Sequence, residues 1–123
     1  MLFRSLFLLD RRTDLIISGG VNIYPAEIES VLVTHPKIRD AAVFGIPDDD
    51  WGEHVKAVLE PATDVLPNQA LVDEILIYCR ERLAGFKIPR SIDFTVALPR
   101  DPNGKLYKRK LRDPYWEGRD RAI

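Results

Sequence analysis

Two apolar runs joined by a short polar connection constrain the fold of this chain more than any other feature. The first run is Ala41–Ile46 and the second is Val55–Leu59. Pro47–Gly52 lies between them, carries three consecutive aspartates and ends in glycine, as a connection between strands does. The pattern predicts two strands that pair in an antiparallel sheet.

Two helices are predicted around this pair. The first begins at Pro25, because proline suits the first helical position, and it ends at Pro36. Its apolar face comprises Ile28, Val31, Leu32 and His35. The second is capped by Asn68 and stopped by Gly85. Its buried stripe comprises Val72, Ile75, Cys79 and Leu83.

The remaining elements are short. Apolar runs at Leu6–Leu9 and Leu15–Ile17 predict strands, and the alternation of Ile92, Phe94 and Val96 predicts a half-buried strand. A basic helix is expected from about Lys108 to the residue before Pro114. The order of elements predicts an α+β domain, with about three helices packed on a small mixed or antiparallel sheet.

Composition excludes several classes of protein. The chain has 123 residues, which is one domain by length, and no stretch approaches the ~20 apolar residues of a membrane span. A net charge of -1 gives no general case for nucleic acid as a partner. The single cysteine, Cys79, excludes an internal disulfide and favours a reducing cytoplasm. One cysteine and two histidines without ligand spacing predict no bound metal.

Three features have a functional interpretation beside a structural one. Lys105 follows Gly104 in a turn-rich loop and could reach an anionic oxygen, although such a loop can equally be a solvated surface. Gly19 and Gly20 fit a hairpin turn, or a place where a narrow ligand or another backbone passes close by. Trp51 either covers a ligand or packs over the hairpin. His35 and Cys79 lie on apolar helical stripes, so core packing is expected for both.

Two segments together carry a resemblance to a known family. The segment from Asp10 to Glu29 contains Ser-Gly-Gly before Tyr-Pro, and the segment from Leu98 to Lys110 contains the Gly-Lys pair. Their order and spacing resemble the C-terminal domain of an adenylate-forming acyl-CoA synthetase, over about residues 6–116. The resemblance implies that Mg-bound ATP and a carboxylic acid, here a fatty acid, form an acyl-adenylate, and that this domain then rotates so that coenzyme A (CoA) attacks.

The same resemblance implies roles for individual residues. Lys105 is the catalytic lysine of the adenylate step, Arg11 contacts the nucleotide, and Thr13 occupies the hinge, where the family usually has aspartate or lysine. The implied CoA-binding residues are Ser18, Gly19, Gly20, Trp51, Phe86 and Lys87. Ile88 stands where some aryl-CoA ligases carry arginine, so contacts to CoA phosphates would come from Lys87, Arg90 or elsewhere.

The resemblance also implies a domain organisation. Residues 1–5 are expected to be an irregular lead-in, and residues 6–123 a mobile C-terminal domain. Its partner would be a large N-terminal adenylation domain that holds the acyl pocket, so this chain alone is expected to be inactive. The alternative is a free-standing module of the same fold that binds CoA or regulates a partner protein.

Overall fold

The computed structural model describes residues 15–104, 106 and 108–117, and the predicted strand at Leu6–Leu9 lies outside them. The elements in chain order are β1 (Ile16–Ser18), β2 (Val21–Ile23), α2 (Pro25–Leu32), β3 (Ile38–Asp48), β4 (Gly52–Pro61), α3 (Gln69–Arg80), the 3₁₀ turn η1 (Gly85–Lys87), β5 (Ser91–Phe94) and α4 (Arg109–Trp116).

The sheet is mixed. β3 and β4 form the predicted antiparallel pair, and β5 adds to β4 in parallel, which gives the order β3-β4-β5. β1 and β2 form a separate two-stranded hairpin that packs mainly on β4. The outer edge of β3 therefore has no strand beside it within the described sheet.

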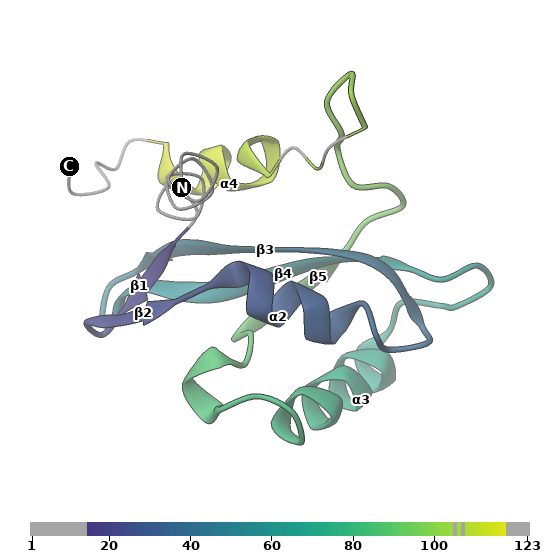
Figure 1. Ribbon diagram of the computed structural model, residues 1–123, viewed down its shortest axis with the longest axis horizontal. Helices are drawn as coiled ribbons and strands as arrows, with labels where there is room; N and C mark the ends of the chain where they lie inside the picture. Colours follow the sequence, from purple (N-terminus) through teal and green to yellow (C-terminus); the bar gives the residue numbers. More distant parts are fainter. Residues whose placement is uncertain (1–14, 105, 107, 118–123) are drawn as a thin grey trace, which may run out of the picture.

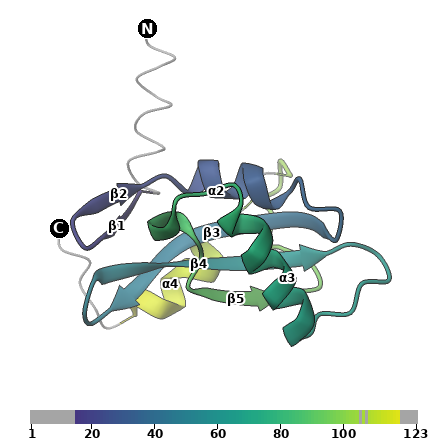
Figure 2. The ribbon, with the colours of Figure 1, turned by 90° about the horizontal axis from the view of Figure 1, so that it is seen from below.

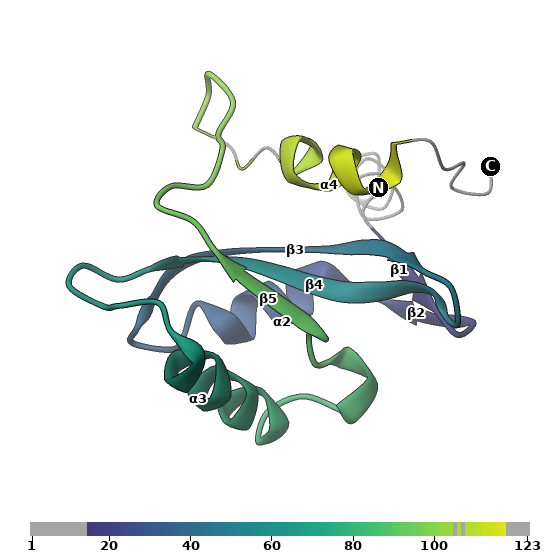
Figure 3. The same cartoon turned by 180° about the vertical axis from the view of Figure 1, so that it is seen from behind.

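The helices lie on both faces of this sheet, as Figures 1 and 3 show. α2 and α3 cover one face, and the view from below in Figure 2 shows α3 in front of the strands and α2 along the β3 side. α4 lies across the opposite face. This arrangement confirms the predicted α+β class with three helices on a small sheet.

The two predicted helices begin where expected but end earlier. Pro25 is the first residue of α2, and the Asn68 side chain accepts a hydrogen bond of 2.9 Å from the Leu71 N–H at the start of α3. α2 ends at Leu32, and α3 ends at Arg80. After each helix the chain forms tight turns, with hydrogen bonds between residues three apart. The chain thereby departs from the helix before it reaches the predicted stop at Pro36 or Gly85.

The last strand and the last helix also differ from expectation. β5 ends at Phe94, and Val96 is 89% exposed because the chain leaves the sheet there. α4 continues through Pro114 to Trp116. Contacts beyond the proline hold this end: the Trp116 indole N–H donates to the Gly45 carbonyl at 2.9 Å, and the Tyr115 ring packs against Phe44.

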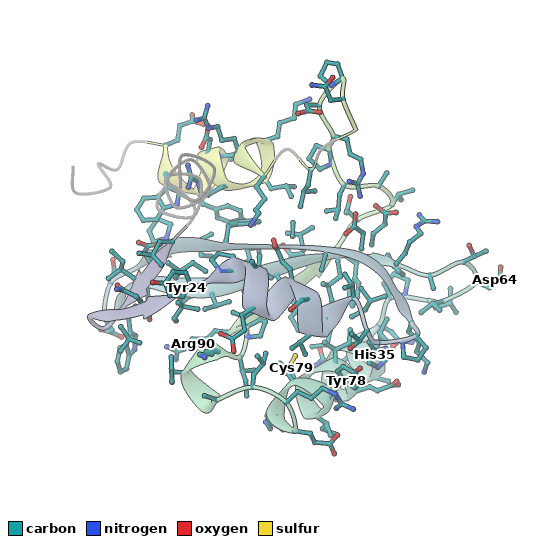
Figure 4. The ribbon with its side chains drawn as sticks, in the orientation of Figure 1. Tyr24, His35, Asp64, Tyr78, Cys79 and Arg90 are labelled. Atoms are coloured by element: carbon teal, nitrogen blue, oxygen red, sulfur yellow. The ribbon has the colours of Figure 1, made fainter. Side chains whose placement is uncertain are left out.

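The structure confirms the prediction that His35 and Cys79 pack in the core. His35 is 4% exposed, and its Nδ1 accepts a hydrogen bond from the Lys37 N–H. Cys79 is fully buried between α3 and the sheet (Figure 4), and this burial raises the pKa of its thiol. Among the described residues, no helix is both long and apolar enough to cross a membrane.

Candidate functional site

The site is built on the turn between β1 and β2. Gly19 and Gly20 adopt φ values of +58° and +82°, a left-handed conformation that glycine reaches without strain. Ser18 pairs with Val21 across this turn. The interpretation of the two glycines as a hairpin turn is therefore confirmed.

Trp51 packs over this hairpin from the turn between β3 and β4. The Gly19 N–H donates to the Trp51 carbonyl at 2.8 Å, and a Cβ atom at Gly19 would overlap the indole ring. No described atom would lie within 4 Å of a Cβ at Gly20. Packing over the hairpin is thus confirmed for Trp51, while half of its surface stays exposed to solvent.

Asp48 fixes the turn that carries Trp51. Its Oδ1 accepts hydrogen bonds from the N–H groups of Asp50 and Trp51 at 2.8 and 3.0 Å, and its Oδ2 lies 2.9 Å from His54 Nδ1. The bonds from Asp50 and Trp51, followed by the one with His54, lower the pKa of Asp48, because they favour its ionised form. The carboxylate therefore holds the indole in place at neutral pH.

A groove of about 350 Å³ opens beside the hairpin and below Trp51. It is lined by Ser18, Gly19, Val21, Ile23, Trp51, Gly85, Phe86, Ile88 and Arg90. Four of the residues implied to bind CoA meet here, although they come from three separate parts of the sequence: Ser18, Gly19, Trp51 and Phe86. Gly20 and Lys87 do not line the groove.

Among the described lining residues, Arg90 brings positive charge to the groove. Its guanidinium lies 6.0 Å from the centre of the Trp51 ring, and Figure 4 shows Arg90 between the hairpin and η1. Lys87 instead forms an ion pair with Glu27 of α2 at 2.9 Å. The sequence did not decide between Lys87 and Arg90. The choice depends on how η1, which ends at Lys87, directs each side chain relative to the groove.

A second region flanks the Gly-Lys loop on the α4 side of the sheet. The catalytic candidate Lys105 lies outside the described residues, as do Arg11 and Thr13. Its sequence neighbours are described: Gly104 has a φ of +85°, and Leu106 pairs with Arg100 in an antiparallel bridge. The described residues before and after position 105 therefore meet through this bridge.

Among the residues that the structure describes, no group of three or more histidine, cysteine, aspartate or glutamate side chains is placed to hold a metal ion. The chemistry that the groove offers is instead recognition: two half-exposed aromatic rings, a backbone turn without side chains, and one guanidinium.

Related proteins are similar to this chain in sequence over nearly its whole length. A long-chain-fatty-acid–CoA ligase of Mycobacterium tuberculosis is 44% identical over 110 residues, which are 89% of this chain and 21% of that ligase. A 2-succinylbenzoate–CoA ligase of Bacillus cereus is 48% identical over 108 residues, which are 87% of this chain and 21% of the ligase. The chain thus spans about a fifth of the length of the curated relatives it matches.

Solved structures agree. An acyl-CoA synthetase of Brucella canis superposes with a TM-score of 0.80 at 36% identity, over 85% of this chain and 19% of that one. An o-succinylbenzoate CoA synthetase of Bacillus subtilis, in complex with its acyl-adenylate intermediate, gives 0.74 at 45% identity, over 83% and 20%. Residues 27–105 match the family described as the AMP-binding enzyme C-terminal domain, and this chain belongs to that family.

Proposed function

We propose that this chain is the mobile C-terminal domain, residues 6–123, of an enzyme that joins a carboxylic acid to CoA. The acid first reacts with Mg-bound ATP to give an acyl-adenylate and pyrophosphate. The CoA thiol then attacks the acyl carbon and displaces AMP. The large N-terminal domain that the relatives' length implies would supply the acyl pocket.

The groove beside the hairpin is the observation that carries this proposal. Ser18 and Gly19 line the groove with a small side chain and with none, which suits a thin pantetheine arm, whereas Trp51 and Phe86 present aromatic faces on which an adenine can stack. Arg90 supplies a cation that suits a phosphate oxygen. We assign this groove to CoA, and we include Gly20 and Lys87 at its margin.

The other half-reaction is assigned to the basic loop. Lys105 would stabilise the negative charge that develops on the carboxylate and the α-phosphate as the adenylate forms. Arg11 would contact the nucleotide, and Thr13 would be the pivot about which the domain rotates between the two steps.

For the acid, we propose a fatty acid. The M. tuberculosis relative is a long-chain-fatty-acid ligase, whereas the B. cereus relative of similar identity acts on 2-succinylbenzoate, so both acids belong in the first substrate panel. We place the enzyme in the cytoplasm, where ATP and CoA are available and where the unpaired thiol of Cys79 stays reduced.

Separation of the half-reactions by mutation tests the proposal. In the full-length ligase, Lys105→Ala should slow pyrophosphate exchange by ~10²–10³-fold, the scale of one lost charge-stabilising group, and should spare thioester formation from a supplied acyl-adenylate. Trp51→Ala should do the reverse and raise the KM for CoA by about tenfold, the lower range for loss of one stacked base.

The control is Ile77→Ala, which removes a comparably exposed apolar side chain from α3, away from the groove. It should change neither activity. Equal loss of both activities in Lys105→Ala and Trp51→Ala, without a change in melting temperature, would contradict the assignment of two steps to two regions.

The isolated chain tests the alternative of a free-standing module. It should unfold cooperatively and form no acyl-CoA from ATP, CoA and acid. Tight binding of CoA by the isolated chain in equilibrium dialysis, with no adenylation domain encoded upstream in the same reading frame, would favour the module instead.

A further inference from the structure

The outer edge of β3 is bound by side chains at Val43. The Val43 N–H points away from β4 and donates to Glu29 Oε2 of α2 at 2.8 Å. The Val43 carbonyl points the same way and accepts from Lys108 Nζ at 2.9 Å. Lys108 Nζ and Glu29 Oε2 are themselves 2.8 Å apart, so the three groups form a closed triangle of contacts.

This triangle is largely shielded from water. The side chains of Lys108 and Glu29 are only 19% and 21% exposed. An ion pair in such a setting is screened less than a surface pair, and each member also satisfies a backbone group that no strand pairs with. Loss of either charge therefore leaves the other and the strand edge without a full set of partners.

A second anchor holds the chain just before the Gly-Lys pair. The guanidinium of Arg100 forms an ion pair with Asp40, near the start of β3, and donates to the Gly104 carbonyl at 3.3 Å. Arg100 also pairs with Leu106 through the antiparallel bridge. The described residues on both sides of position 105 are thus attached to one strand.

The two anchored segments flank Lys105 in the sequence. Gly104 comes one residue before Lys105, and Lys108 comes three residues after it. A charged group that stabilises a transition state must be held to within a fraction of an ångström, and a displacement of about 1 Å can cost ~10²-fold in rate. Both anchors use β3, an edge strand of the three-stranded sheet, as the fixed reference.

We propose that Glu29 and Lys108 are positioning residues for the adenylate step, which hold the Gly-Lys loop in register with β3. This inference rests on the proposed function of Lys105. Neither residue needs to touch the substrate: Glu29 acts through Lys108, and Lys108 acts by fixing the start of α4.

Two single variants and their combination test the inference in the full-length ligase. Lys108→Met keeps the length of the side chain without its charge, and Glu29→Gln keeps an acceptor for the Val43 N–H. Each should lower the rate of pyrophosphate exchange by about tenfold and leave thioester formation from supplied acyl-adenylate within about twofold. Lys108→Arg should restore most of the exchange, because it restores the charge.

The double variant distinguishes positioning from direct contact with substrate. If Glu29 acts only through Lys108, the double variant should lose no more activity than either single variant. The control is Lys110→Met, an exposed lysine on the same helix, which should retain full exchange.

The outcomes separate the two proposals. A wild-type ligase with no pyrophosphate exchange on any acid would overturn the proposed function. An active wild-type ligase whose Glu29→Gln variant exchanges as fast as wild type, or whose double variant shows the product of the two single losses, would overturn the positioning role alone. Parallel loss of both half-reactions together with a lowered melting temperature would also overturn it, because the pair would then only stabilise the fold.

Discussion

The two faces of the β3-β4-β5 sheet are held by different forces. Among the described residues, the face under α2 and α3 buries fourteen in one apolar cluster, whereas the face under α4 buries five. α4 itself has no buried residue and is attached through directional contacts to β3, including the Lys108–Val43 and Trp116–Gly45 hydrogen bonds. Apolar burial supplies stability without direction, while hydrogen bonds fix orientation at small net gain. Within the part of the chain that the structure describes, the first face therefore supplies most of the apolar stabilisation, and the second attaches the segment for which we propose a role in the adenylate step.

The largest expected effect separates the two faces by stability. Ile75 is fully buried under α3, so Ile75→Ala should lower the free energy of unfolding by about 3 kcal/mol. Leu111 is only partly buried against the smaller cluster, so Leu111→Ala should cost about 1 kcal/mol. Urea unfolding monitored by circular dichroism measures both, and equal losses would mean that α4 contributes as much apolar stabilisation as α3.

An intermediate loss of stability is expected at Gly19, where the β1–β2 turn contacts Trp51. Gly19→Ala introduces a Cβ that meets the Trp51 ring, in a left-handed conformation that costs an alanine about 1 kcal/mol by itself. The total loss should be about 2 kcal/mol. In a Trp51→Ala background only the conformational part should remain. An unchanged penalty in that background would show that the ring moves aside freely.

The smallest effect concerns pH. Because the pKa of Asp48 is lowered in the folded chain, its contribution to stability is complete above the pKa of the unfolded state and is lost as the pH falls through the folded value. The wild-type chain should therefore lose more stability than Asp48→Asn as the pH falls below about 4, the ordinary pKa of an aspartate. If the free energy of unfolding fell in parallel with pH for the two proteins, the Asp48 carboxylate would not stabilise the turn that carries Trp51.

Local signals predicted most of the fold. The hairpin of β3 and β4, the start of α2 at Pro25 and the cap of α3 at Asn68 each depend on neighbours within a few residues. The continuation of α4 past Pro114 was missed, because its support comes from Gly45, about seventy residues earlier in the chain.

The candidate site was likewise predicted only in part from the sequence. The family resemblance implied a shared role for Ser18, Gly19, Trp51 and Phe86, and all four line one groove, but their role in CoA binding stays a prediction. The pairing of Glu29 with Lys108 had no sequence signal, since two charges 79 positions apart carry no local pattern. Only the path of β3 brings them together.

The burial of Cys79 has a practical consequence for testing the proposed domain rotation. The chain contains one thiol, it is fully buried, and its raised pKa keeps it protonated at neutral pH, so alkylating dyes should leave it unmodified. A cysteine introduced at Val96, which is 89% exposed and lies outside both functional regions, would then take a single fluorophore without removal of the native thiol. The native sequence is thereby already suited to distance measurements by energy transfer.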